Sequence, residues 1–361
     1  MDDDSVNMRR LRRDDPAAYL GARLGERGTN RLVQASDAGV PLATLVVAAR
    51  WWQLESYLRQ LLYLTLTAEH GHEWEAALPR QARNRAEKAV ELGYMASADD
   101  DYPLAHLDVT PLFELIDALW DRTKSGIGLP QAVWAGRIAE LKPVRHRLAH
   151  CRRPHSDDVD RIEQLLRDLE PAAHRTLWSY CNWQEPSRNL ADPIVDAWVH
   201  RHHPAASRLV EHGERNKGIH FTLTASALPW AEDLPVITGS KGWFWVMRVY
   251  LVERHLYIED YCTELAVRAA LPVIGHIVQS DPGSIAVTIP AAQDADLIAD
   301  TLGNLLDSAF TESRPGDVDG LRHPWKSVST AEDPRIDVGG VLSVLSGIDR
   351  DDPISLFEAR S

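Results

Sequence analysis

The stretch of sequence that decides the fold of the first half of the chain is Lys142-Pro143-Val144-Arg145-His146-Arg147-Leu148-Ala149-His150. At about 100° per residue, a helix places Val144, Leu148 and Cys151 on one apolar face, which we expect to point into a helical bundle. His146 and His150 are four residues apart and share the opposite face. Pro143 suits the first turn of such a helix, because its missing N–H needs no partner there.

Helical periodicity continues on both sides of this stretch. Before it, apolar residues recur at three- and four-residue steps and predict an amphipathic helix that ends near Gly71: Leu45, Trp52, Leu58, Leu61, Leu62 and Leu66. Further helices are expected over residues 80–92, 111–123 and 134–141, with a loop over residues 121–128. After it, Ser156 is expected to cap a long helix that continues past Pro171 to Tyr180. These patterns predict an all-α N-terminal half.

The periodicity changes to two beyond residues 183–193, a stretch with Pro and Asn that we expect to be a linker. Strands are expected over residues 220–224, 243–252, 255–262 and 284–289, followed by an amphipathic helix over 292–310 and a loop over 314–337. The fold class predicted is α+β overall, an all-α helical bundle followed by a smaller α+β domain with an antiparallel sheet. The expected boundaries are a flexible arm (1–30), a helical domain (31–182), a linker or helical connection (183–215) and an α+β accessory domain (216–361).

Composition limits the classes of function. The 361 residues carry a formal net charge of −14, which argues against broad, nonspecific nucleic-acid binding. The positive charges are nevertheless clustered, at residues 8–13, 80–88 and 142–153. A local basic site on an acidic body therefore stays compatible with the charge balance.

The cysteines and the first residues predict the compartment. The three cysteines are odd in number and form no Cys-x-x-Cys pair, which favours a reducing compartment. The acidic start, Met1-Asp2-Asp3-Asp4, is unlike the basic beginning of a signal peptide, and the apolar runs are shorter than a membrane span. We therefore expect a cytoplasmic protein that does not enter a membrane.

The basic stretch contains the groups needed to cleave RNA without a metal or any other cofactor. An imidazole such as that of His146 or His150 can move a proton to or from a 2′-hydroxyl or a leaving oxygen near neutral pH. The guanidinium of Arg145 can neutralise the charge that develops on phosphorus. Arg145 lies about 140° from His150 on an ideal helix, so its long side chain must bend toward the histidines.

The segment Arg145-His146-Arg147-Leu148-Ala149-His150 resembles the R-[polar]-x-x-x-H motif of HEPN domains, the "higher eukaryotes and prokaryotes nucleotide-binding" superfamily. In that family a helical bundle precedes the motif and a long helix follows it, which is the order expected here. The run Trp51-Trp52-Gln53-Leu54-Glu55-Ser56-Tyr57-Leu58-Arg59, with Trp74 further on, resembles the opening helix of the large, tryptophan-bearing members. The resemblance covers about residues 40–180.

The resemblance implies a metal-independent endoribonuclease with a toxin, antiviral-defence or RNA-control role. It implies a homodimer in which two copies of the motif form one active site. Arg145 matches the motif arginine, His146 the polar second residue and His150 the closing histidine. Four further cations would hold the phosphates of the RNA substrate: Lys142, Arg147, Arg152 and Arg153.

Two other interpretations of the same residues stay open. One is a catalytically silent HEPN-like scaffold that binds a protein or nucleic-acid partner, since fold alone does not give function. The other is a solvated helix face whose arginines extend their charged ends into water. With an active nuclease the C-terminal domain is expected to sense, dock or restrain, and with a silent scaffold it is expected to bind a protein partner or regulator.

Other candidate sites are weaker. His70-Gly71-His72-Glu73 and His200-Arg201-His202-His203 lack the spacing and the cysteines of a zinc site, so helix-end or loop histidines are favoured. Gly239-Ser240 resembles the start of a nucleotidyltransferase domain, but the acidic pair Glu259-Asp260 follows too late. Trp243-Phe244-Trp245 is expected to be strand core, with a ligand-stacking surface as the alternative.

Overall fold

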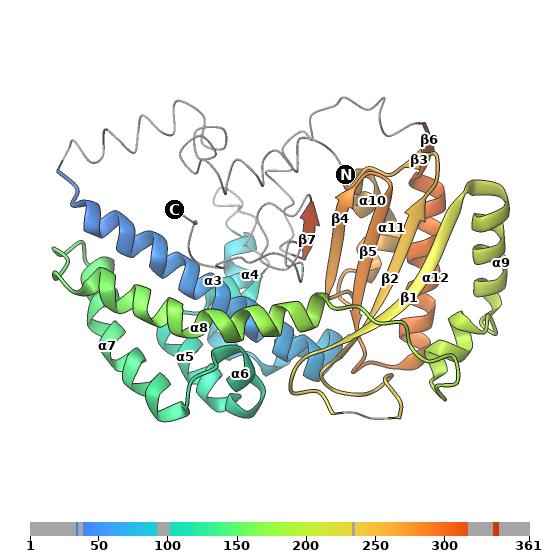
Figure 1. The fold of residues 1–361 in the computed structure, drawn as a ribbon. Helices are drawn as coiled ribbons and strands as arrows, with labels where there is room; N and C mark the ends of the chain where they lie inside the picture. The colour runs from blue at the N-terminus through green and yellow to red at the C-terminus, as the bar shows by residue number, and fades with distance from the viewer. Residues whose placement is uncertain (1–33, 35–38, 92–101, 233–234, 317–334, 339–361) are drawn as a thin grey trace. The chain divides into compact units, whose positions relative to one another are not determined.

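The computed structural model describes residues 34, 39–91, 102–232, 235–316 and 335–338. The fold is mixed helix and sheet, which confirms the α+β class (Figure 1). The chain divides into two compact units. The described residues of the first are 34, 39–61 and 115–177, and those of the second are 62–91, 102–114, 178–232, 235–316 and 335–338. Both units are discontinuous in sequence, whereas the domains expected from the sequence are continuous stretches.

The first unit is helical. It takes residues from α3 (Leu42–His70) and α5 (Val109–Ala118), together with α6 (Trp120–Ile127), α7 (Gln131–Ala149) and most of α8 (Asp158–Cys181). The buried Tyr57 hydroxyl donates to the Gly126 carbonyl at 2.7 Å, which joins α3 to α6. Gly126 is required there, since an added Cβ would lie 2.5 Å from a Leu61 methyl carbon. The fully buried Trp134 donates its indole N–H to Asp117, 3.1 Å away, and joins α7 to α5.

Several expectations for the first unit are wrong. Residues 121–127 belong to α6 rather than to a loop, because Thr123 is buried and its hydroxyl contacts the Ile116 and Leu119 carbonyls. Gly128, at φ 70°, ends this helix in the left-handed conformation that glycine adopts most readily. The separate helix over 134–141 is also absent: α7 is continuous, and Pro143 lies exposed inside it rather than in a first turn.

The helix starting near Ser156 instead begins at Asp158, whose carboxylate accepts the His155 N–H at 2.8 Å. It continues past Pro171 to Cys181, as expected. On α3, Trp52 is 69% exposed rather than part of the inner face, where Trp51 and Leu54 lie together with the expected Leu58.

The second unit contains further helices besides its share of α3, α5 and α8. These are α4 (Arg80–Glu91), α9 (Pro204–His212), α10 (Ile258–Thr263), α11 (Leu265–Ala270) and α12 (Ala295–Glu312). Short 3-10 turns span Gly71–Ala77 and Pro103–His106, and π-helical turns span Val195–Val199 and Gly213–Lys217.

A sheet of order β1-β2-β5-β4-β7 forms the centre of the second unit (Figure 1). Its strands are β1 (Ile219–Ala227), β2 (Trp243–Leu251), β5 (Ser284–Pro290), β4 (His276–Asp281) and β7 (Ile336–Val338). The first four pair antiparallel, while β7 pairs parallel to β4. β3 (Arg254–His255) pairs separately with β6 (Arg314–Pro315).

One face of this sheet packs on helices. Trp245, Met247 and Val249 of β2 share a hydrophobic core with Leu302 and Leu305 of α12. Trp245 and Phe244 are fully buried, so the tryptophan-rich stretch is strand core as expected. The expected strand over 255–262 is wrong, because α10 occupies most of it, and β4 was not expected. Short strands β6 and β7 lie in the expected loop over 314–337, of which residues 317–334 are outside the described residues.

Candidate active site at the end of helix α7

The candidate site is built on the last turn of α7. Trp134, Ile138, Leu141 and Val144 are buried along one side of this helix and hold it in the first unit. The opposite side near the C-terminus carries His146 and His150, both exposed, with ring centroids 4.4 Å apart. The expected pairing of these two histidines on one face is confirmed.

The chain turns sharply after His150, which caps α7. The Arg152 N–H donates to the Arg147 carbonyl at 2.9 Å, and the Cys151 N–H donates to the Leu148 carbonyl at 3.2 Å. This pair of bonds is the Schellman ending of a helix, in which the residue after the cap adopts a left-handed conformation. Cys151 adopts it, at φ 50°, although it carries a Cβ. Cys151 is exposed, so the expectation that its thiol points inward is wrong.

Arg147 is tied to the start of α8. Its Nε donates to Asp158 Oδ2 at 2.8 Å, and its Nη2 donates to Asp158 Oδ1. The Asp158 side chain is 2% exposed. Burial acts to raise the pKa of Asp158, but hydrogen bonds from Arg147 and from the His155 N–H, with the Arg147 charge, hold it below its ordinary value. Arg147 therefore closes the turn between the two helices, and its guanidinium is occupied.

Arg145 lies against α3. Its Nε is 3.6 Å from Glu55 Oε1, which is too long for a hydrogen bond, and that nitrogen is buried without a hydrogen-bond partner. Glu55 is 13% exposed and accepts hydrogen bonds from Trp51 Nε1 and from Arg59, the latter at 2.6 Å. Glu55 thus positions Arg145 electrostatically. Among the described residues, Arg145 makes no hydrogen bond to His146 or His150.

The remaining predicted cations are open to solvent. Lys142, Arg152 and Arg153 are exposed and form no ion pair with any described carboxylate. Desolvation by neighbouring groups, followed by the charges of His150 and Arg152, lowers the pKa of His146 below its ordinary value of 6.5. His146 is consequently a neutral imidazole at pH 7 and can accept a proton.

The structure adds two residues that sequence reasoning missed, Glu55 and Asp158. Glu55 lies four residues after Trp51 and four before Arg59, the spacing at which helical side chains meet. That spacing indicates a contact within α3. It does not indicate that the same carboxylate faces Arg145, because the distance of 90 residues along the chain carries no such information.

The other histidine clusters serve as local structural contacts. His203 caps α9 by accepting the Ala205 N–H at 3.3 Å, and His202 pairs with Asp196 at 2.8 Å. His72 contacts Gln293 at 3.2 Å. Across the described part of the chain, no group of three His, Cys, Asp or Glu side chains could hold a metal ion.

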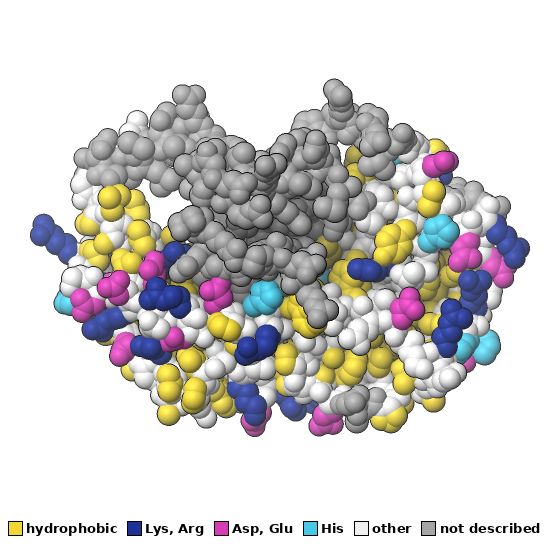
Figure 2. Space-filling view, in the orientation of Figure 1, with side chains coloured by type: hydrophobic (Ala, Val, Ile, Leu, Met, Phe, Trp, Pro, Cys, Tyr) yellow, Lys and Arg dark blue, Asp and Glu magenta, His cyan; other side chains and the backbone are white. Residues whose placement is uncertain are grey.

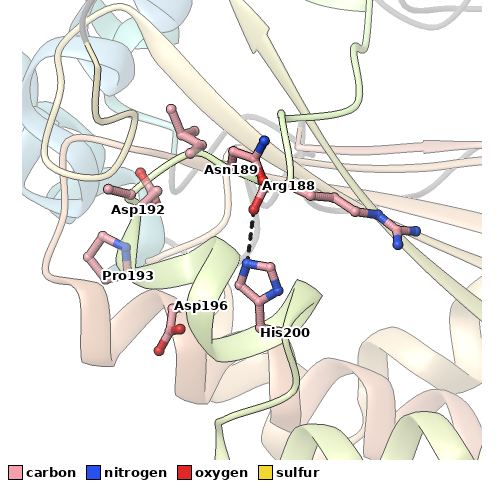
Figure 3. A pocket seen from close by; sticks show the side chains of 8 residues that line it. Arg188, Asn189, Asp192, Pro193, Asp196 and His200 are labelled. Carbon is pink, nitrogen blue, oxygen red and sulfur yellow. Dashed lines mark hydrogen bonds between the residues drawn. The ribbon is translucent and has the colours of Figure 1, made fainter.

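A hollow of about 460 Å³ lies beside the π-helical turn Val195–Val199 (Figure 3). Asp192 lines it, but its oxygens accept from Ile194 N, Ile237 N and Thr238, so this carboxylate is fully engaged. His200 Nε2 lies 2.9 Å from the Arg188 carbonyl. Because these groups hold the local backbone, the hollow carries no argument for chemistry.

Comparisons with known proteins name no relative: no family model, curated protein or solved structure matches this chain. Among the described residues, no helix is long and apolar enough to cross a membrane.

Proposed function

We propose that this chain is a metal-independent endoribonuclease of the HEPN type, with its active centre at the end of α7. The observation that carries the proposal is the pair His146 and His150, exposed side by side at 4.4 Å between ring centroids. Uncompensated Lys142, Arg152 and Arg153 lie close to this pair in the sequence. Imidazoles move protons and the cations hold phosphates, which is the combination that cleavage by a 2′-hydroxyl needs.

The reaction follows from these groups. Neutral His146 accepts the proton of the 2′-hydroxyl, whose oxygen attacks the adjacent phosphorus. The bond from phosphorus to the 5′-oxygen breaks, and a protonated imidazole gives that oxygen its proton. The products are a 2′,3′-cyclic phosphate and a 5′-hydroxyl, so no electron donor or water is consumed in this step.

The geometry of one helix favours a homodimer. In an in-line displacement the attacking and leaving oxygens lie on opposite sides of phosphorus. Two imidazoles whose ring centroids are only 4.4 Å apart would lie on the same side of a phosphate. We therefore propose that a second copy supplies the groups on the far side, in keeping with the symmetric pairing common among oligomers. We further propose a toxin, antiviral-defence or RNA-control role, with the second unit as regulator.

Cleavage without a metal is the direct test. RNA should be cut in the presence of EDTA, and DNA of the same sequence should not, since it lacks the attacking hydroxyl. His150→Ala and Arg145→Ala should each lower the rate by at least ~100-fold, the scale of losing a proton-transfer group. Circular dichroism should show that both variants are folded. Rates within a few-fold of the unmodified chain would refute the assignment.

A catalytically silent scaffold is the second candidate, favoured by the ion pairs of the motif. Arg145 lies beside Glu55, and Arg147 is fixed by Asp158. Two cations of the motif therefore stabilise the packing of α7 against α3 and α8. A scaffold that binds a protein or nucleic-acid partner predicts that His150→Ala leaves partner binding unchanged. The cleavage assay with EDTA separates the two candidates.

A further inference from the structure

The four antiparallel strands of the second unit have a second face, opposite the hydrophobic core. Register places its side chains in rows that cross the strands. His220 of β1 lies opposite Tyr250 of β2, and Tyr250 lies opposite Ser284 of β5. In the next row Thr222 lies opposite Arg248. Val246 and Ala286 share this face, which therefore combines polar, aromatic and smaller apolar side chains, whereas the core face is apolar.

One half of this face is closed. Thr224, Thr288 and His276 are at most 5% exposed. The Tyr180 hydroxyl lies 3.3 Å from His276 Nδ1, and the Tyr180 ring packs edge-on against Phe244 at 5.0 Å. Burial raises the pKa of Tyr180, so its hydroxyl stays protonated. These contacts leave no room for a ligand in the closed half.

The other half is open. Tyr250 is 40% exposed, His220 is exposed, and Thr222 and Arg248 are half-buried. Figure 2 shows basic, histidine, acidic and hydrophobic side chains at the surface over β1 and β2. The open half thus combines an aromatic ring, a cation and several hydrogen-bonding groups at the surface of the sheet.

Arg248 is held in a fixed orientation. Its guanidinium carbon lies 4.1 Å from the centroid of the Trp183 ring, and its Nη1 donates to the Tyr250 hydroxyl at 3.1 Å. No described carboxylate pairs with it. Trp183 Nε1 is buried without a hydrogen-bond partner, which leaves an unsatisfied donor beside the cation. The charge is therefore not paired with a described carboxylate, and the guanidinium is held over the Trp183 ring.

We propose that this open half, formed by Trp183, His220, Thr222, Arg248 and Tyr250, binds single-stranded nucleic acid. A base stacks on the exposed face of Tyr250, and the Arg248 guanidinium holds an adjacent phosphate. A single strand fits because its bases are free to stack, whereas those of a duplex are already stacked. Charge complementarity favours a phosphate over an apolar peptide, since an apolar occupant would bury Arg248 unpaired.

The inference does not rest on the proposed ribonuclease, because it concerns binding on a different unit. It also agrees with the acidic body, since a net charge of −14 leaves only local sites for a polyanion. A DNA oligonucleotide separates the two proposals experimentally. It has bases and phosphates, yet it lacks the 2′-hydroxyl that cleavage needs.

The test measures fluorescence anisotropy of a labelled single-stranded DNA oligonucleotide with the full-length chain. Tyr250→Ala and Arg248→Ala should each weaken binding about tenfold, the scale of one stacked base. Tyr250→Phe keeps the ring and should bind nearly as well as the unmodified chain. Arg208→Ala, an exposed arginine of α9 without an ion pair among the described residues, is the matched control and should change little.

Salt dependence gives a second measurement. Losing one phosphate contact should reduce the slope of log affinity against log salt by about 0.7 in Arg248→Ala, whereas Tyr250→Ala should keep the slope. Melting curves should show that the variants are folded. The proposal is overturned if the unmodified chain does not bind, if a blunt duplex binds as tightly, or if Arg248→Ala and Arg208→Ala lose affinity equally.

Discussion

Asp158 accepts two hydrogen bonds from the Arg147 guanidinium and one from the His155 backbone N–H, and so fixes the turn that joins α7 to α8. The carboxylate is 2% exposed, while the Arg147 side chain is 27% exposed. This ion pair supports the helix end on which His146 and His150 lie. Arg147, which is predicted to hold RNA, thus also holds the local fold, so its mutation should affect stability as well.

The pH dependence of stability follows from Asp158. Its pKa in the folded chain is below the ordinary value of 3.8, so its contribution is fully present above about pH 4 and is lost as the pH falls through the lowered pKa. Asp158→Asn should reduce the free energy of unfolding by about 2 kcal/mol at pH 7. The difference between the two proteins should shrink in more acidic buffer. Urea denaturation at several pH values measures this, with the exposed Asp160→Asn as control.

At Cys151 we predict that a substitution raises the stability of the chain. A residue with a Cβ at φ 50° is strained by about 1 kcal/mol relative to glycine. Cys151→Gly should therefore raise the urea midpoint, while Cys151→Ala, which keeps the Cβ, should not. Equal midpoints for the two variants would contradict the left-handed conformation at this position.

The sequence predicted the elements whose signals are local. The periodicity of α3 and α12 and the alternation of β1 arise from burial of one face, and each was found close to its predicted range. The predictions were wrong where contacts with distant parts of the chain determine the secondary structure. Residues 121–127 are polar enough for a loop, but burial of Thr123 and the fit of Gly126 against α3 favour a helix. Pro143 lies inside α7, where a sequence rule places a helix start.

For the candidate site, the sequence predicted the contact between the two histidines but not the partners of the arginines. The spacing of His146 and His150 requires only helical geometry, and their rings do meet. The engagement of Arg145 by Glu55 and of Arg147 by Asp158 depends on which helices pack together. A single sequence does not show which residues form such pairs. An arginine that is free in the folded chain therefore cannot be distinguished, from sequence alone, from one that forms an ion pair.

The proposed proton acceptor predicts a pH–rate profile. The pKa of His146 is lowered, so cleavage should rise with pH through an acid limb below pH 6.5, where His146 loses its proton. Arg152→Ala removes a charge that lowers this pKa, and the acid limb should therefore move to higher pH. Arg152→Lys keeps the charge and should keep the limb in place. An acid limb that does not move in Arg152→Ala would assign the proton acceptor to another group.

Glu55 should act as a positioning residue for Arg145. Glu55→Gln removes the charge facing Arg145 while keeping the size of the side chain, and kcat should fall by up to about 100-fold if the guanidinium is displaced. KM should change less, because the phosphate-holding cations are untouched. Glu163→Gln is the matched control, since Glu163 of α8 pairs at 3.4 Å with Arg50 of α3, the helix that carries Glu55, and makes no ion pair with Arg145 among the described residues. Equal losses in both variants would indicate a general effect on packing.

Assembly gives the last prediction. Arg145 lies toward α3, away from hydrogen-bond contact with His146 and His150 of its own chain, and we therefore expect one chain alone to supply an incomplete set of groups. Symmetric pairing of two chains would bring the arginine of one toward the histidines of the other. Arg145→Ala and His150→Ala chains, each inactive alone, should then regain partial cleavage when mixed, because one of the two arginine–histidine pairings in the shared site of a mixed dimer keeps both groups. Light scattering of the same samples measures the assembly. Full activity from a strictly monomeric chain would show that one copy suffices, and mixed inactive chains would then stay inactive.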